Sequence, residues 1–294
     1  MAVVDTVDTA PALLGADEQG VGRCGGIARR LEVALPAAVL VLIGAACFLG
    51  PLVLPVPPPT GGSVLESYLD AGSPGHLLGT DPNGNDILSR ILHGGRSSLV
   101  VAVAVNVLGL LVGGTLGALS GYVGGAVDTV IMRVLDVLIA FPSLVLTLAV
   151  AQSLGASQTN TILALAFFSI PAFARISRAA TLRLRELPFM AAAQLCGTPG
   201  RRVLLRHIAP NITPQLITFG MLGMGIVMVI EGALSFLGLG IPMPAPSWGN
   251  MIAQGQQSLS ATPMLVVWPC AALFGTVLAF NLLGETLRAR WSGR

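Results

Sequence analysis

The stretch RISRAATLRLRELPFMAAAQLCGTPGRRVLLRHIAPN, residues 175–211, is the long polar interval of an otherwise apolar chain. It contains seven of the sixteen basic residues: Arg175, Arg178, Arg183, Arg185, Arg201, Arg202 and Arg206. Loops with an excess of arginine next to membrane-spanning segments stay on the cytoplasmic side. The stretch therefore predicts a cytoplasmic loop, from which the rest of the chain can be oriented.

The composition on both sides of this loop is that of a membrane protein. Hydrophobic residues make up 53% of the 294 residues and charged residues 10%, and the mean hydropathy is +0.80. A soluble domain is about one quarter charged. Apolar runs long enough to cross a bilayer, about 20 residues each, predict an all-α bundle of six transmembrane helices. We expect them near residues 33–54, 97–121, 128–152, 161–176, 212–237 and 262–284.

The segments between these helices set the predicted organisation and orientation. Residues 1–32 predict a flexible tail, residues 33–294 the membrane domain, and residues 55–96 an outer segment. With both termini in the cytoplasm, fourteen of the sixteen arginines are cytoplasmic: three in the tail, Arg133, seven in the polar loop and three at the end. The opposite orientation would reverse this ratio, so the positive-inside rule favours cytoplasmic termini.

The residue types that the chain lacks exclude several functions. There is no lysine, so the chain has no Walker A phosphate loop and no Schiff-base lysine. If ATP drives the protein, another chain binds the ATP. The four cysteines form no C-x-x-C pair and the three histidines are scattered, which gives no metal-site spacing. Topology already explains the arginines, so a nucleic-acid partner is not favoured. We predict no catalytic residue, metal ligand or cofactor in this chain.

Glycines recur every four residues in the second predicted span, at Gly109, Gly113, Gly117 and Gly121. On a helix this spacing forms a stripe that lets another backbone approach closely. Helix packing is the interpretation that we favour, and a pore lining or hinge is the alternative.

Charged residues within the predicted spans give two further candidates. Glu231 lies in the fifth span, and a carboxylate at membrane depth usually faces protein or a water-filled cavity. It is an intramembrane site candidate, with a structural hydrogen bond near the outer end as the alternative. Arg133 and Asp136 are three residues apart and predict an ion pair on one helix face, with a gating contact as the alternative. Pro171 predicts a kink or an interruption in the fourth span.

Two outer stretches also carry signals. Beyond Asp86, the apolar positions recur at helical spacing and predict a short amphipathic helix on the membrane surface. Local physics alone favours the alternative, a solvated loop with Asp86 as a helix cap. Residues 238–252 are rich in proline and glycine and predict an irregular outer loop, in which Trp248 suits an interfacial anchor.

The polar stretch itself predicts a helical hairpin. Residues 190–196 are rich in alanine and favour a helix, which Gly197 can end in the left-handed region. Thr198 and Pro199 then restart a helix as its cap and first-turn residue. Such a hairpin suits a groove on a partner protein, and the alternative is an amphipathic hairpin resting on anionic lipid.

Four stretches resemble, in matching order, the smaller permease subunit of bacterial dipeptide and oligopeptide ABC importers: residues 76–99, 190–211, 231–252 and 278–288. The three alanines 191–193, followed after three residues by Gly197, resemble the EAA coupling loop of these permeases. Asn85 stands where the family usually has arginine, and Ala191 where it has glutamate. Alanine keeps the helix, but any salt bridge of that glutamate is lost.

The resemblance implies a type I importer permease in the bacterial inner membrane, with residues 175–211 as its coupling loop. The residues expected to dock on an ATPase are Met190, Ala191, Ala192, Ala193, Gly197, Thr198, Arg201 and Arg202. It also implies a second permease subunit, two cytoplasmic ATPases that hold ATP and magnesium, an extracytoplasmic binding protein, and lipid around the bundle. The implied solute is a di- or oligopeptide, with nickel, glutathione and haem-like cargo left open. A secondary transporter is the alternative, but it would need coupling-ion residues in several spans, and the intramembrane charges are few.

Overall fold

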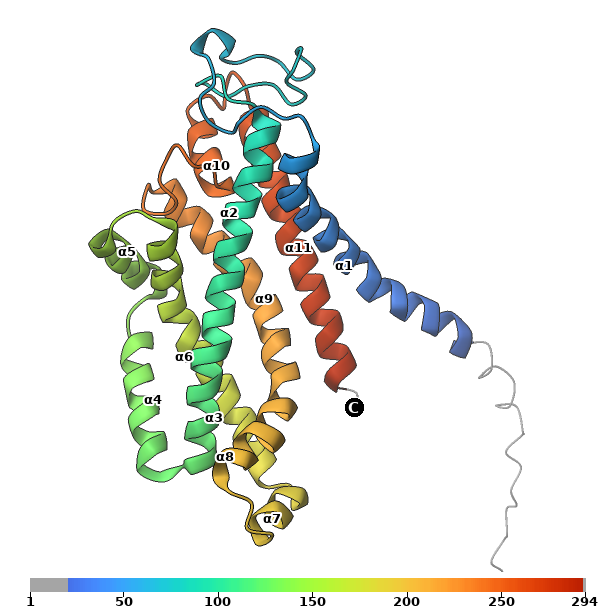
Figure 1. Cartoon of the computed structure of the whole chain (residues 1–294), viewed down its shortest axis with the longest axis vertical. Helices are drawn as coiled ribbons and strands as arrows, with labels where there is room; N and C mark the ends of the chain where they lie inside the picture. Colours follow the sequence, from blue (N-terminus) through green and yellow to red (C-terminus); the bar gives the residue numbers. More distant parts are fainter. Residues whose placement is uncertain (1–20, 293–294) are drawn as a thin grey trace, which may run out of the picture.

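A computed structural model describes residues 21–292, and this part of the chain is almost entirely helical (Figure 1). The α-helices are α1 (Val21–Val53), α2 (Ile87–Leu108), α3 (Gly114–Val123), α4 (Gly125–Ile139), α5 (Ser143–Leu154), α6 (Gln158–Arg185), α7 (Pro188–Leu195), α8 (Gly200–Val203), α9 (Ala209–Phe236), α10 (Trp248–Gln256) and α11 (Met264–Ser292). A 3₁₀ turn (Val64–Glu66) and two π-helical turns (Gly109–Gly113 and Leu204–Ile208) complete the helical elements.

Five stretches in the described part are long and apolar enough to cross a membrane: Glu32–Val53, Ile87–Val123, Gln158–Arg185, Gly200–Phe236 and Met264–Trp291. Together α4 and α5 form a sixth candidate span that is bent by 86°. The predicted all-α bundle is therefore confirmed, but its third span is broken rather than straight. Pro142 accounts for the break, because proline cannot continue the hydrogen bonding of α4 and disfavours helix at Phe141.

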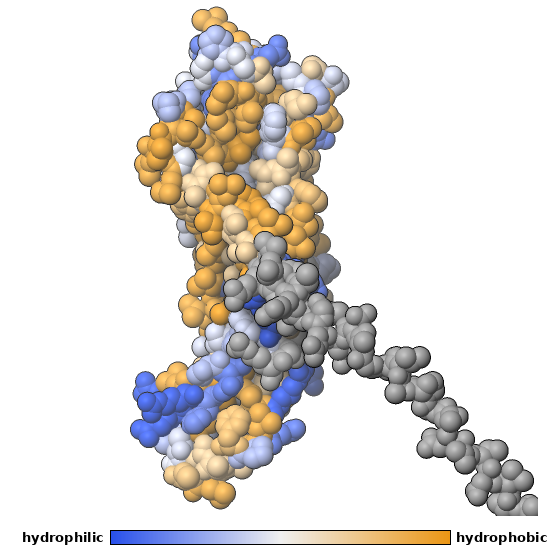
Figure 2. Space-filling view, turned by 90° about the vertical axis from the view of Figure 1, so that its right-hand side faces the viewer, coloured by the Kyte–Doolittle hydropathy of each residue, from blue (hydrophilic) through white to orange (hydrophobic). Residues whose placement is uncertain are grey.

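The hairpin of α7 and α8 lies at one end of the bundle, at the bottom of Figure 1, and residues 54–86 cap the other end. The first described turn of α1 and the last turn of α11 both point toward the hairpin end. Figure 2 shows hydrophobic residues over the middle of the face that α1 and α11 form, and the densest hydrophilic surface near the hairpin end. This distribution fits a bundle whose middle lies in lipid.

Helix α1 starts earlier than the predicted first span but ends where that span was predicted to end. It begins at Val21 rather than near residue 33, so the predicted tail is helical from Val21 onward. The charges before residue 33 mark where the apolar run begins, and charged residues do not stop a helix. Residues 1–20 of the predicted tail lie outside the described residues. At the other end, Pro51 lies inside α1, which ends at Val53.

Residues 87–123 form one continuous helix through α2, the π-helical turn and α3. The predicted separate amphipathic helix on the membrane surface is therefore wrong. Asp86 is an N-cap, as the alternative held: its Oδ2 accepts a hydrogen bond from the Ser89 amide at 2.7 Å. Ile87 and Leu92 are buried, so the apolar residues that gave the amphipathic pattern pack against protein.

Helices also occupy most of the predicted cytoplasmic loop 175–211. α6 continues to Arg185 instead of ending near Ile176, and Pro171 lies inside it without ending it. The next candidate span is already helical from Gly200. Arginine is a good helix former, so the polar residues of this stretch mark the edge of the membrane rather than the end of a helix.

The outer stretch 238–252 is not wholly irregular, because α10 begins in it at Trp248. Ser247 caps this helix and accepts a hydrogen bond from the Asn250 amide at 3.2 Å. Trp248 is 1% exposed, and its indole nitrogen donates to the Ile91 carbonyl at 2.9 Å. The predicted interfacial anchor is therefore wrong: Trp248 is a core side chain that joins α10 to α2.

The glycine stripe, which lies in the π-helical turn after α2 and in α3, faces α6. A Cβ atom on Gly113 would overlap the carbonyl oxygen of Ile170, and one on Gly117 would overlap that of Ala174. A Cβ atom on either of the other two glycines would meet side chains of α6: Ser169 for Gly109, and Thr181 for Gly121. The two helices thus approach backbone to backbone, which favours helix packing over a pore lining for these positions.

Candidate functional site

The hairpin between α6 and α9 is held to the bundle by a small apolar cluster. Met190 of α7 and Val203 of α8 are both fully buried and pack with Phe173 and Ile212. Gly197 lies between the two helices with φ +71°, a left-handed conformation that glycine adopts without a steric cost. Buried anchors on each short helix therefore fix the hairpin against the membrane bundle.

The other predicted docking residues lie mainly on the outside of this hairpin. Ala191, Ala192, Gly197, Arg201 and Arg202 are exposed, and Ala193 and Thr198 are half-buried.

Exposed apolar side chains lie beside these docking residues. Leu195 is 90% exposed and Leu205 62% exposed. The predicted cap differs in detail, because Pro199 rather than Thr198 is the N-cap of α8 and accepts from the Arg202 amide at 2.8 Å. The hairpin thus presents a mixed apolar and cationic surface away from the bundle.

A cavity of about 720 Å³ lies between α2, α6, α9 and the break between α4 and α5. Its walls are mostly aliphatic and aromatic; the uncharged polar residues are Asn106, Thr147 and Ser169, and Arg175 is its charged residue. Sites for small organic ligands are typically about 300–1,000 Å³ and mostly apolar. The sequence does not predict this cavity, because residues from five separate helices, α2, α4, α5, α6 and α9, form it.

Two ion pairs join α4 to α6 next to this cavity. Arg178 donates to both carboxylate oxygens of Asp128, at 2.5 and 2.6 Å, and Ser120 also donates to Asp128. Arg175 donates through Nη2 to Oδ1 of Asp136 at 2.7 Å. The predicted pair between Arg133 and Asp136 is therefore wrong. A helix-local spacing rule cannot anticipate that a facing helix offers a better-placed guanidinium.

Glu231 is buried at the contact of α2, α9 and α10. Its side chain is 1% exposed, and it accepts hydrogen bonds from Ser98 at 3.0 Å and from Ser235 at 2.7 Å. Ser98 also lies 3.4 Å from the backbone nitrogen of Trp248, which donates to it. Glu231 is not among the residues that line the cavity, and its contacts are those of a structural hydrogen-bond centre.

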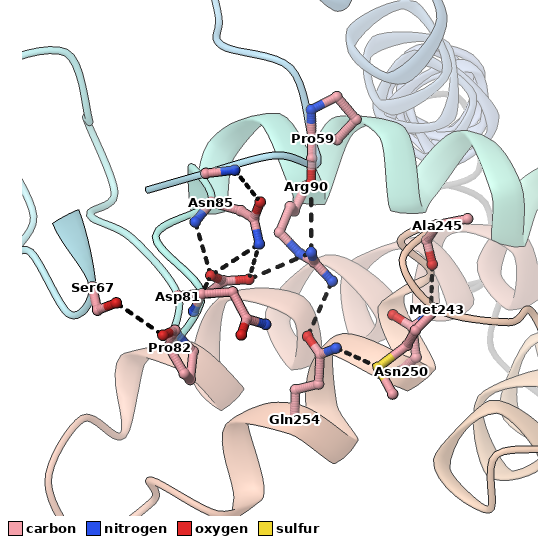
Figure 3. Close-up of polar contacts among 12 residues, drawn as sticks. Pro59, Ser67, Asp81, Pro82, Asn85, Arg90, Met243, Ala245, Asn250 and Gln254 are labelled. Atoms are coloured by element: carbon pink, nitrogen blue, oxygen red, sulfur yellow. Dashed lines mark hydrogen bonds and ion pairs between the residues drawn. The ribbon is translucent and has the colours of Figure 1, made fainter. Parts of the chain in front are cut away.

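A second buried polar cluster, which the sequence did not predict, lies at the outer end (Figure 3). Arg90 is 2% exposed; its Nη1 lies 3.4 Å from Oδ2 of Asp81, and its Nη2 donates to Gln254 of α10 at 3.0 Å. Asn85 donates to Asp81 at 2.9 Å and accepts from the Gly62 amide at 2.9 Å.

The cluster therefore joins the outer segment to α2 and α10. One signal for it is present in the sequence, since Arg90 lies close to the acidic residues Asp81 and Asp86, with which it can form an ion pair. Among the residues that the structure describes, no group of three or more histidine, cysteine or acidic side chains is placed to hold a metal ion.

Comparison with known proteins identifies the family. Residues 113–290 match the family described as "Binding-protein-dependent transport system inner membrane component". The chain is 41% identical over 229 residues to the glutathione transport system permease protein GsiD of Pectobacterium atrosepticum, covering 76% of each chain. It is 38% identical over 223 residues to the dipeptide transport system permease protein DppC of Alkalihalophilus pseudofirmus, covering 76% of this chain and 73% of the relative.

The fold has a counterpart among solved structures. A chain of the MetNI methionine ABC transporter, in an inward-facing conformation, superposes with a TM-score of 0.55 at 15% identity and covers 68% of this chain and 95% of its own length. This supports the fold, and the family follows from the sequence matches. The protein therefore belongs to the family of inner membrane components of binding-protein-dependent transport systems, and it is a multi-pass inner membrane permease rather than an ion-coupled carrier.

Proposed function

We propose that this permease is one of two membrane subunits of an ATP-driven importer of small peptides. The observation that carries the proposal is the 41% and 38% identity, over three quarters of the chain, to permeases named for glutathione and dipeptide transport. Glutathione is itself a tripeptide. The cavity of about 720 Å³ has room for a solute of this size.

The partners follow from what the chain contains. It has no lysine and hence no Walker A loop, so two separate ATPase subunits hold and hydrolyse the ATP and magnesium. They dock on the α7–α8 hairpin, through its exposed alanines and through Arg201 and Arg202. A second permease covers the open side of the cavity, and an extracytoplasmic binding protein delivers the solute to the outer end. No nucleic acid takes part.

The orientation follows from the same arrangement. The arginine-rich hairpin lies at the end of the bundle toward which both described ends of the chain point. The positive-inside rule places that end in the cytoplasm. Residues 33–294 then form the permease domain, with residues 54–86 at the outer end and residues 186–203, which include the α7–α8 hairpin, as the cytoplasmic coupling segment.

Reconstitution of the complete complex in proteoliposomes tests this function. We expect uptake of labelled trialanine that requires both the binding protein and ATP, and that survives an ionophore that collapses ion gradients. Uptake that needs an ion gradient and proceeds without ATP would show a secondary carrier instead. Mass spectrometry of the solute that copurifies with the complex identifies the natural cargo.

A further inference from the structure

We propose that Arg175 is a carboxylate-binding site in the translocation cavity, where the carboxylate of a passing peptide takes the place of Asp136. This inference rests on the proposed function and names the chemical group that the cavity recognises. It starts from the lining of the cavity, in which Arg175 is the charged residue. The attraction between a cation and an anionic group of a solute is stronger in a mostly apolar cavity than in water.

The contact between Arg175 and Asp136 has the geometry of an ion pair in which another carboxylate can replace Asp136. It joins one guanidinium nitrogen to one carboxylate oxygen, at 2.7 Å, and the two side chains are 51% and 44% exposed. A guanidinium can present two parallel N–H groups to a carboxylate. A peptide carboxylate that enters the cavity can therefore gain a second hydrogen bond that Asp136 does not make.

The neighbouring pair shows what a fixed contact looks like in the same helices. Arg178 holds both oxygens of Asp128, and Ser120, which is fully buried, also donates to Asp128. Neither Arg178 nor Asp128 lines the cavity. The bidentate pair therefore lies outside the cavity and joins the two helices, whereas the single-contact pair, one turn away along α6, presents Arg175 to the cavity.

The position of Asp136 connects this exchange to the bend in the third span. Asp136 lies in the last turn of α4, and the following residues Ile139, Phe141 and Pro142 all line the cavity. When the solute replaces Asp136, α4 loses its contact with Arg175 next to the break. When the solute leaves, Asp136 competes for the guanidinium, and this keeps binding weak enough for release, as a transport path requires.

Uptake of a peptide with a free carboxylate, compared with its C-terminal amide, tests the assignment. The probes are labelled trialanine and a tripeptide amide that the wild-type complex also transports. The rate ratio of acid to amide is measured for each variant and divided by the wild-type ratio, so that discrimination by the binding protein cancels. We expect Arg175→Gln to lower this ratio about fivefold, the scale of one partly exposed charged contact, and Arg175→Lys to lower it less.

Two further variants keep the test decisive. Asp136→Asn removes the competing carboxylate and should raise the ratio, and it gives the answer if Arg175→Gln fails to assemble. Arg178→Gln is the matched control outside the cavity and should slow acid and amide equally. Unchanged ratios in both Arg175→Gln and Asp136→Asn would overturn the carboxylate site and leave the peptide importer intact. A wild-type complex that takes up neither peptide would instead overturn the proposed function.

Discussion

At Glu231, the contacts decide between two roles that a carboxylate at membrane depth can have. Hydroxyl groups of α2 and α9 donate to its two oxygens, and the Ser98 hydroxyl also meets the start of α10. Glu231 lies outside the cavity lining. Glutamine can hold the same two serines without a charge, because its Oε1 accepts a hydrogen bond from one hydroxyl and its Nε2 donates one to the oxygen of the other.

We therefore expect Glu231→Gln to keep both the yield of the complex and its peptide uptake within about twofold of wild type. Glu231→Leu leaves buried hydroxyls without a partner, which costs about 1–3 kcal/mol, and should lower the melting temperature and the yield. Ser98→Ala, which removes one donor, should give a smaller loss. Thermal unfolding of the purified complex and uptake assays measure these effects. Loss of uptake in Glu231→Gln with unchanged yield would show that the charge itself acts in transport.

At the scale of elements, the contact of α3 with α6 depends on the absence of side-chain atoms at the glycine stripe. The carbonyl oxygen of Ala174 occupies the place that a Cβ atom on Gly117 would need. Backbone atoms cannot swing away as a flexible side chain can, so even alanine forces the helices apart. A glycine in α11, Gly275, has nothing within 4 Å of the same position.

Gly117→Ala should therefore destabilise the protein by about 1–3 kcal/mol, the usual cost of overpacking. Gly275→Ala is the matched control, and should be neutral or slightly stabilising because alanine favours helix. Thermal unfolding of the two variants in detergent makes the comparison. Equal stability of the two would mean that α3 and α6 do not pack as closely as the structure shows.

The hairpin separates residues that attach it to the bundle from residues that face outward. Met190 is fully buried, whereas Leu195 on the same short helix is 90% exposed. If the outward surface docks on the ATPase, Leu195→Arg should weaken copurification of the ATPase and lower uptake. It should change the melting temperature little, since exposed substitutions usually stay within about 0.5 kcal/mol.

Met190→Ala should affect stability where Leu195→Arg does not, because it opens a void in the apolar cluster that anchors the hairpin. We expect it to lower the melting temperature, at a cost of about 2–5 kcal/mol. Full ATPase binding and uptake in Leu195→Arg would argue that the hairpin rests on lipid instead.

At the scale of the whole molecule, the spans and the position of the hairpin could be predicted because burial in lipid needs long apolar runs. The ends of the helices could not be predicted, because α6 continues through the polar residues Arg183 and Arg185 beyond its apolar run. Pairings between distant segments could not either: Asp136 with Arg175, Arg90 with Gln254, and Trp248 with Ile91. Each of these depends on how helices face one another, which a periodic pattern along one helix does not contain.

The orientation of the bundle gives the last prediction, and the structure selects the positions that test it. Leu65 is 96% exposed in the outer segment and Leu195 is 90% exposed in the hairpin, whereas Ser247, in the outer loop, is fully buried and unsuitable. In a chain whose native cysteines are replaced, a membrane-impermeant thiol reagent should label Leu65→Cys from the periplasmic side of intact cells. The same reagent should label Leu195→Cys only after the membrane is permeabilised. The arginine-rich hairpin and both described chain ends point to one end of the bundle. Labelling of Leu195→Cys in intact cells would therefore show that this end lies outside the cell, where the hairpin could not contact a cytoplasmic ATPase.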